Sequence, residues 1–196
     1  MPRVSSAAVS LLTLGLVGVL ASQGLGQGPG NDEAKVNTGL AIAPVPLDLH
    51  GKNRALVGLG SYIVNAQSDC AGCHSAFPTF APGGDPYAGE DPVYNPDTYL
   101  VGNPIIFGPD FPPRNLTPNG DGDPAGLSLS QFLETMRTGR DLKNRPPHLP
   151  SDDNDLLQIM PWPAFRQMSD RDLKAIYEYL RAIPCLTTPD RPNRCD

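Results

Sequence analysis

The chain has 196 residues, a formal net charge of −6, and an unusually high proline content, 23 residues, beside 20 glycines. This length suits one domain, and the acidic balance argues against nucleic acid as a partner. Proline and glycine together stay below the range of disordered chains, so we expect much of the protein to be ordered loop.

Residues 1–26 have the pattern of a signal peptide. A single positive charge, Arg3, precedes an uncharged apolar run from Ala7 to Leu20, and small and polar residues follow. The run is shorter than the roughly 20 residues that span a bilayer, although an uncleaved membrane anchor is an alternative. We therefore expect an exported, periplasmic protein that meets a membrane only through its partners or through such an anchor.

The segment before the first cysteine has two parts. Residues 27–54 show no sustained apolar period and end in charged, turn-prone residues, which predicts an extended N-terminal arm. A helical stripe of apolar residues then runs from Ala55 to Ala66. Gly58 and Gly60 weaken its helix propensity, and glycines within a helix often mark a close crossing by another helix. We expect that other helix to be the C-terminal one.

The sequence Cys70-Ala71-Gly72-Cys73-His74 is the signature of covalent haem attachment. Two thiols three residues apart on a helical turn can each bond one haem vinyl group, and the histidine is then the proximal iron ligand. A zinc site would need a second Cys/His pair at suitable spacing, and a thioredoxin-like dithiol would follow a strand. Neither pattern occurs here. We predict one haem c on Cys70 and Cys73, with its iron bound by His74.

Residues 75–127 are rich in proline and glycine and have no amphipathic period. A loop of this length is usually functional, and we expect it to cover one haem edge and exclude water.

Residues 119–123 resemble the start of a calcium loop, but Pro124 replaces the required glycine and Ser130 replaces the bidentate glutamate. An EF-hand is therefore excluded, and a solvated acidic turn or a weak, irregular calcium site remains. The glycosylation sequon at Asn115 more simply serves backbone hydrogen bonding.

Two further helices are predicted from their caps and apolar stripes. The first begins at Ser128, where Gln131 completes a capping-box pattern, and ends at Gly139. The C-terminal helix begins at Ser169, a serine cap with an acid three residues on, and Pro184 stops it. With the helix over residues 55–66, these helices are expected to enclose the haem.

The distal iron ligand has five candidates. They are Met136, Met160, Met168, His50 and His148. Met136 lies on the apolar stripe of a helix and Met168 just before a helix cap, so both suit core packing. Met160 lies in the loop Met160-Pro161-Trp162-Pro163, where prolines fix the backbone and a tryptophan can shield the haem. We predict Met160 as the distal ligand, with His148 as the alternative.

Cys185 and Cys195 follow the last helix among several prolines. An exported protein would normally oxidise such a pair, and closing this loop is worth roughly 2–3 kcal/mol in the chain-entropy model. We predict a structural disulfide that pins the C-terminal tail, residues 185–196, against the domain. A Cys195 thiol that pairs between molecules is the alternative.

Together these motifs resemble class I c-type cytochromes, especially the cytochrome c domains that accompany bacterial membrane-bound alcohol and sugar dehydrogenases. The motifs are Cys70-Ala71-Gly72-Cys73-His74, Asn115-Leu116-Thr117-Pro118, Arg137-Thr138-Gly139-Arg140-Asp141, Met160-Pro161-Trp162 and Ser169-Asp170-Arg171-Asp172-Leu173. The resemblance implies an all-α cytochrome c fold over residues 55–184, with three to four helices around one haem and a long Pro/Gly-rich loop. It also implies His74 as proximal and Met160 as distal ligand.

These observations predict a mono-haem c-type cytochrome, an electron carrier rather than an enzyme. It would transfer single electrons between redox partners, with a dehydrogenase or a terminal oxidase as candidates, and its acidic balance predicts partners with a basic surface. Two alternatives stay open. An open-site haem protein with peroxidase or small-ligand chemistry would bind carbon monoxide when reduced, and a non-catalytic haem subunit of a dehydrogenase complex would co-purify with a larger subunit.

Overall fold

The computed structural model describes residues 29–108, 111–141, 155–189 and 194–196. The predicted signal peptide, residues 1–26, and His148 lie outside the described residues. The helices are α1 (Pro29–Ile42), α2 (Arg54–Tyr62), the π-helix η1 (Ile63–Gln67), α3 (Cys70–His74), the 3-10 helix η2 (Pro86–Ala88), α4 (Leu129–Thr138), α5 (Trp162–Phe165) and α6 (Asp170–Ala182).

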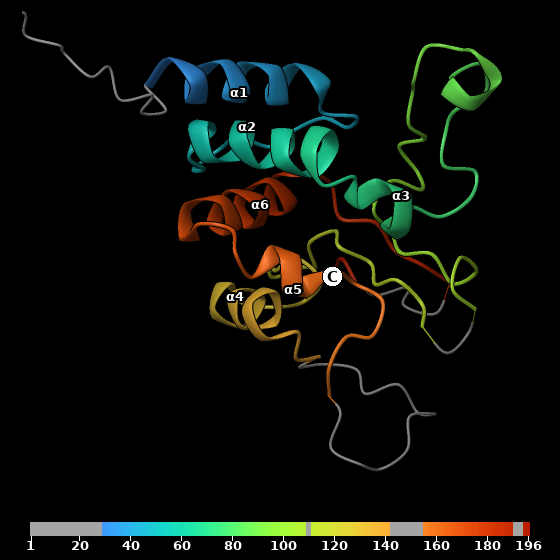
Figure 1. The fold of residues 1–196 in the computed structure, drawn as a ribbon. Helices are drawn as coiled ribbons and strands as arrows, with labels where there is room; N and C mark the ends of the chain where they lie inside the picture. The colour runs from blue at the N-terminus through green and yellow to red at the C-terminus, as the bar shows by residue number, and fades with distance from the viewer. Residues whose placement is uncertain (1–28, 109–110, 142–154, 190–193) are drawn as a thin grey trace, which may run out of the picture.

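The described part of the chain is helical and contains no strand, only isolated β-bridges. The prediction of an all-α fold is therefore confirmed at this level. None of the helices in the described ranges is both long and apolar enough to cross a membrane. In Figure 1, α1, α2 and α6 lie one above another as three layers, and α4 and α5 lie beyond α6.

Helix α2 is packed on both sides through its glycines. A Cβ atom on Gly60 would lie 1.9 Å from the carbonyl oxygen of Ala175, so α6 crosses α2 at the backbone of this residue. This is the crossing predicted between the two helices. A Cβ on Gly58 would instead lie 2.6 Å from the carbonyl oxygen of Val36 in α1. The two glycines therefore serve two different neighbours.

Helix α1 corrects the prediction of an extended N-terminal arm over residues 27–54, which is wrong for its first half. The helix lacks a broad apolar stripe and docks through a narrow face instead. A Cβ on Gly39 would lie 1.9 Å from the carbonyl oxygen of Gly58, and the Ser61 hydroxyl donates to the Gly39 carbonyl over 2.6 Å. Backbone contact stabilises α1, and such contact leaves little apolar period to detect.

Helices α4 and α6 begin and end where their caps predicted. Ser128 and Gln131 form the reciprocal capping box, and Gly139 ends α4 in the left-handed conformation. The Ser169 hydroxyl caps α6 by accepting from the Asp172 amide over 3.1 Å. The core between the helices is built from their buried faces. Its fully buried members on these helices include Val57, Val64, Leu173, Tyr179 and Leu180.

The long Pro/Gly-rich loop leaves the helical stack directly after α3. Its outer part around η2 extends away from the stack in Figure 1. An aromatic row lines its return, with ring centroids 5.2 Å apart for Phe80 and Tyr94 and 5.6 Å apart for Tyr94 and Tyr99. Tyr99 and Leu100 are then fully buried. The inner part of the loop, rather than its tip, therefore belongs to the core beside the haem motif.

Candidate haem site

Helix α3 brings Cys70, Cys73 and His74 onto one short turn. The π-helix η1 ends α2, with the Ser68 amide donating to the Ile63 carbonyl over 2.9 Å, and the Asp69 side chain caps α3. Both thiols are free, Cys73 exposed and Cys70 partly buried. Burial raises the pKa of the Cys70 thiol to about 12 and also raises that of Cys73, with the Asp69 carboxylate as the second cause in each case. Both are therefore protonated thiols at neutral pH.

The ring of His74 is held by the main chain of a distant loop. Its Nδ1 atom lies 2.7 Å from the carbonyl oxygen of Arg114. Because a carbonyl only accepts, Nδ1 carries the proton and Nε2 keeps its lone pair for a metal. Burial lowers the pKa of His74, which favours this neutral form. The His74 carbonyl in turn accepts from the Gly102 amide over 2.7 Å, which fixes the end of α3.

This donor set fits the haem group expected from the sequence. Two thiols one turn apart and a neutral imidazole with a free Nε2 are the groups that attach and ligate haem c. The carbonyl that orients the imidazole is the outer-shell partner that metal-binding histidines regularly have. The fit rests on α3 and on the loop that contains Arg114.

Arg114 also connects this loop to the segment that precedes Met160. Its guanidinium forms an ion pair with the Asp141 carboxylate, and the two side chains are only 18% and 8% exposed. The Asp141 amide donates to the Asp155 carbonyl over 2.6 Å, and Leu157 donates to the Gly139 carbonyl over 2.8 Å. Residues 139–141 and 155–157 therefore run side by side as a short ladder.

Met160 follows this ladder and is partly buried against the core. Its carbonyl accepts from the Trp162 amide over 2.8 Å, and the Trp162 indole donates to the Leu157 carbonyl over 3.1 Å. A Cβ on Gly139 would lie 2.3 Å from the Trp162 ring. The loop is thus anchored at both ends. Met160 is linked to His74 through these segments and not through a shared element, so its role as distal ligand stays a prediction.

The other described candidates for the distal position have ordinary structural places. Met136 is 5% exposed in the core on α4, and Met168 packs against the same core. His50 is exposed in the loop before α2, where its amide donates to the Asp48 carboxylate over 3.0 Å. The calcium-loop resemblance also has a structural explanation, because Asn119 accepts from the Asp123 amide over 2.7 Å in a local turn.

Sequence reasoning missed a polar cluster beside Cys70. The hydroxyls of Tyr99 and Tyr179 lie 2.8 Å apart, and the Asn65 side chain hydrogen-bonds both. Burial, followed by the neighbouring Tyr179 hydroxyl, raises the pKa of Tyr99 well above its usual value. Tyr99 lies in a segment without an amphipathic period, and nothing in the sequence pairs it with Tyr179. Arg114 was missed for a different reason, because its bond to His74 uses the carbonyl that every residue has.

The relatives of this chain indicate its class of protein. No family model matches the chain, and no solved structure matches it. The curated proteins that it resembles are cytochrome c subunits of dehydrogenases, which confirms the resemblance predicted from the motifs.

Three of these relatives illustrate the extent of the match. The gluconate 2-dehydrogenase cytochrome c subunit of Pantoea cypripedii is 32% identical over 127 residues, 65% of this chain and 23% of that protein. The cytochrome c subunit of the quinone alcohol dehydrogenase of Gluconobacter oxydans (strain 621H) is 26% identical over 127 residues, 65% of this chain and 21% of that protein. The fructose dehydrogenase cytochrome subunit of Gluconobacter japonicus is 25% identical over 139 residues, 70% of this chain and 22% of that protein. The chain thus spans about a quarter of the length of these relatives.

Proposed function

We propose that this chain is an exported, mono-haem c-type cytochrome that transfers single electrons and works with a dehydrogenase. The observation that carries the proposal is the arrangement at α3, where two thiols share one turn with a histidine whose Nδ1 donates to the Arg114 carbonyl over 2.7 Å. The names of the relatives support a dehydrogenase as the partner.

In this proposal Cys70 and Cys73 would hold the haem by adding their thiols to its two vinyl groups, and His74 and Met160 would bind its iron. When bound, the haem supplies an iron that alternates between Fe(III) and Fe(II), and a thioether ligand raises its reduction potential. The protein's own residues keep the His74 ring neutral and oriented, and the buried residues Tyr99 and Leu100 exclude water beside α3. No substrate has to reach the metal.

The acidic charge of the chain, −6, is expected to favour a partner with a basic surface. Electron exchange with that partner should slow as salt concentration rises, because screening weakens interactions between exposed charges. If the partner is a dehydrogenase, the two proteins should also co-purify or exchange electrons directly. A rate with a dehydrogenase that does not depend on salt would argue against the electrostatic part of the proposal.

The first test is the optical spectrum of the exported protein, oxidised and reduced, with and without carbon monoxide. A c-type reduced spectrum with the weak long-wavelength band of methionine-ligated ferric haem, unchanged by carbon monoxide, is the expected result. Carbon monoxide binding without that band would favour an open-site haem protein. Absence of covalent haem would overturn the proposal.

The distal ligand is tested by Met160→Ala, with Met168→Ala as the matched control. Both methionines are partly buried against the core, so both substitutions remove similar packing. Only Met160→Ala should abolish the long-wavelength band and open the iron to carbon monoxide. If the two variants behave alike, the assignment of Met160 is wrong.

A further inference from the structure

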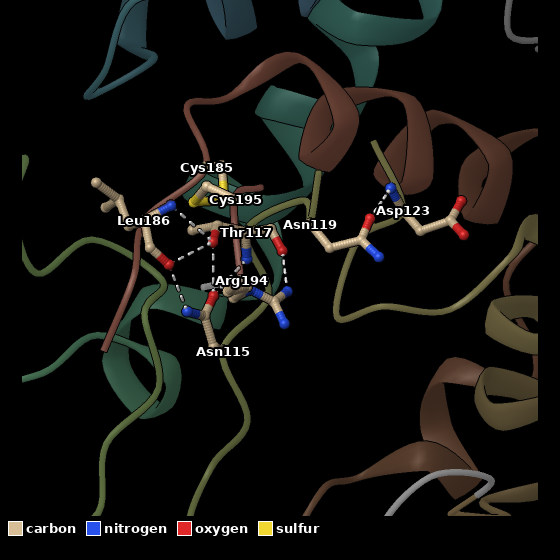
Figure 2. Close-up of a disulfide and its surroundings, with 8 residues drawn as sticks. All are labelled: Asn115, Thr117, Asn119, Asp123, Cys185, Leu186, Arg194 and Cys195. Carbon is tan, nitrogen blue, oxygen red and sulfur yellow. Dashed lines mark hydrogen bonds between the residues drawn. A yellow bond between two sulfur atoms is a disulfide. The ribbon is translucent and has the colours of Figure 1, made fainter. Parts of the chain in front are cut away.

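The predicted disulfide between Cys185 and Cys195 is present, with its Cα atoms 5.8 Å apart. The bridge closes the C-terminal tail into a loop next to residues 115–123, as Figure 2 shows. The closure restricts the unfolded chain, but it does not explain why the residues next to the bridge lie at this particular loop.

The residue after Cys185 hydrogen-bonds the loop twice. The Leu186 amide donates to the Thr117 hydroxyl over 3.2 Å, and the Asn115 side-chain amide donates to the Leu186 carbonyl over 3.0 Å. The Thr117 hydroxyl itself donates to the Asn115 side-chain oxygen over 2.7 Å, which closes the set. Figure 2 shows these three residues facing one another. One side of the disulfide is thus fixed to Asn115 and Thr117.

The residue before Cys195 hydrogen-bonds the same loop from the other side. The Arg194 guanidinium donates to the Thr117 carbonyl, and the Arg194 carbonyl accepts from the Gly120 amide over 3.0 Å. A Cβ on Gly120 would lie 2.0 Å from the Asp196 carbonyl oxygen, so the tail contacts the loop at its backbone. Both neighbours of the bridge therefore hold one short segment. The disulfide links these two contacts covalently.

This segment adjoins the group that orients the proximal histidine. The carbonyl that accepts from His74 Nδ1 belongs to the peptide between Arg114 and Asn115. Peptide groups are planar, so fixing Asn115 also restricts the direction of that carbonyl. The following amide, of Leu116, donates to the Leu100 carbonyl over 2.8 Å. The tail thus acts on His74 through a single peptide plane.

We propose that the described residues of the disulfide-closed tail, 185–189 and 194–196, form a brace that positions His74 by fixing the peptide between Arg114 and Asn115. Thr117, which is fully buried, is the positioning residue at its centre. The effect on the iron rests on the proposed function, whereas the effect on the loop does not. Weakening the brace loosens the hydrogen bond from His74 Nδ1 to the Arg114 carbonyl. The imidazole then donates less electron density to the iron, so Fe(III) is stabilised less.

The test is the double variant Cys185→Ser/Cys195→Ser of the full chain, compared with the wild type. Amide exchange at Leu116 and Thr117 should become about tenfold faster, since one or more hydrogen bonds of the segment are weakened. In the haem-loaded protein, the g-values of ferric haem should change and the midpoint potential should become more positive. Unchanged exchange, g-values and potential would overturn the proposal.

A second pair of variants leaves the disulfide in place. Thr117→Val removes the hydroxyl that joins Asn115 to Leu186, and it should shift the g-values and the potential in the same direction as the double variant. Thr117→Ser keeps the hydroxyl and should restore the wild-type values. If the serine variant fails to restore them, packing of the side chain rather than the brace is responsible. If the wild-type protein carries no haem, the proposed function is refuted. Amide exchange at Leu116 would still show whether the tail holds the loop in place.

Discussion

The Nδ1 atom of His74 lies 2.7 Å from the carbonyl oxygen of Arg114, 40 residues further along the chain. Arg114 therefore has two separate tasks. Its main chain orients the predicted proximal ligand, and its side chain pairs with Asp141 at the base of the segment that leads to Met160. The two halves of the candidate site meet at this residue, which allows its two tasks to be tested independently.

Substituting Arg114→Met should remove the ion pair and keep the bond from His74, because the carbonyl belongs to the main chain. The pair is largely buried, so we expect the free energy of unfolding to fall by about 2–3 kcal/mol, somewhat below the value for breaking a fully buried pair. Urea unfolding measures this change. The haem spectrum of the folded variant should retain the features of histidine ligation.

The control for this variant is Arg181→Met. Arg181 pairs with Glu178 over 3.2 Å on the surface of α6, with side chains that are 40% and 20% exposed. A pair of this kind contributes less than about 1 kcal/mol. If the free energy of unfolding fell equally in the two variants, burial of the pair between Arg114 and Asp141 would contribute nothing to stability.

Substituting Gly60→Ala tests the crossing of α2 and α6. In an open helix this change would stabilise by about 1 kcal/mol, since alanine is the better helix former. Here the added methyl would lie 1.9 Å from the Ala175 carbonyl oxygen, so the helices must separate. We expect a net loss of about 2–4 kcal/mol in urea unfolding, as for other overpacked or disrupted cores.

Gly83→Ala is the matched control for that crossing. Gly83 has a φ of +78° and nothing within 4 Å of its position for a Cβ, so the change adds backbone strain without a clash. A loss of about 1 kcal/mol is expected. If Gly60→Ala were as stable as Gly83→Ala, the added methyl at Gly60 would not be forcing the two helices apart.

The features that sequence analysis predicted correctly are those with a local cause. The Ser128 and Ser169 caps and the left-handed Gly139 are set by neighbouring residues, so both helix ends could be predicted. The assignment of Cys70, Cys73 and His74 to one haem c stays a prediction, because it follows from the spacing of the motif alone. Cys185 and Cys195 were paired correctly because the compartment expected for the chain favours oxidation.

The features that were missed depend on contacts between distant segments. Helix α1 is stabilised by the approach of Gly39 to the backbone of Gly58, which needs small residues rather than an apolar stripe. The acceptor for His74 is a main-chain carbonyl, which has no sequence signature. The disulfide was predicted, but the loop that its tail contacts was not. The partners of Leu186 are the Thr117 hydroxyl and the Asn115 side-chain amide, and such groups form hydrogen bonds in so many settings that they do not identify a partner in the sequence.

The stability of the protein should fall at alkaline pH partly through Tyr177. Its hydroxyl lies 3.1 Å from both the Asp123 carboxylate and the Leu127 carbonyl, and its single proton is shared between these two acceptors. Burial, followed by the charge of Asp123, raises the pKa of Tyr177 from 10.0 to about 12. The folded state then holds the proton more tightly than the unfolded state. Its contribution is complete below pH 10.0 and is lost as the pH rises to about 12.

Tyr177→Phe provides the check on this contribution. The variant should be less stable at neutral pH, because the hydrogen bond that the Tyr177 hydroxyl shares between Asp123 and Leu127 is lost. Its free energy of unfolding should also fall less steeply between pH 10.0 and about 12 than that of the wild type. Urea unfolding at a series of pH values measures both effects. Parallel curves for the two proteins would show that Tyr177 does not titrate differently on unfolding.

Substituting Gly139→Ala tests whether the ladder before Met160 controls the distal side. Gly139 has a φ of +75°, and a Cβ there would lie 2.3 Å from the Trp162 ring. The methyl should displace Trp162 and with it the Met160 carbonyl that accepts from the Trp162 amide over 2.8 Å. We expect the long-wavelength band of methionine ligation to weaken or disappear, while the features of histidine ligation remain.

Gly122→Ala separates this displacement from simple backbone strain. Gly122 has a φ of +82° and nothing within 4 Å of its position for a Cβ, so its variant carries a similar strain without touching a side chain. It should lose about 1 kcal/mol of stability and keep the band. If Gly139→Ala also keeps the band, Trp162 does not position Met160. If both variants lose the band, distal ligation depends on overall stability rather than on contact between Gly139 and Trp162.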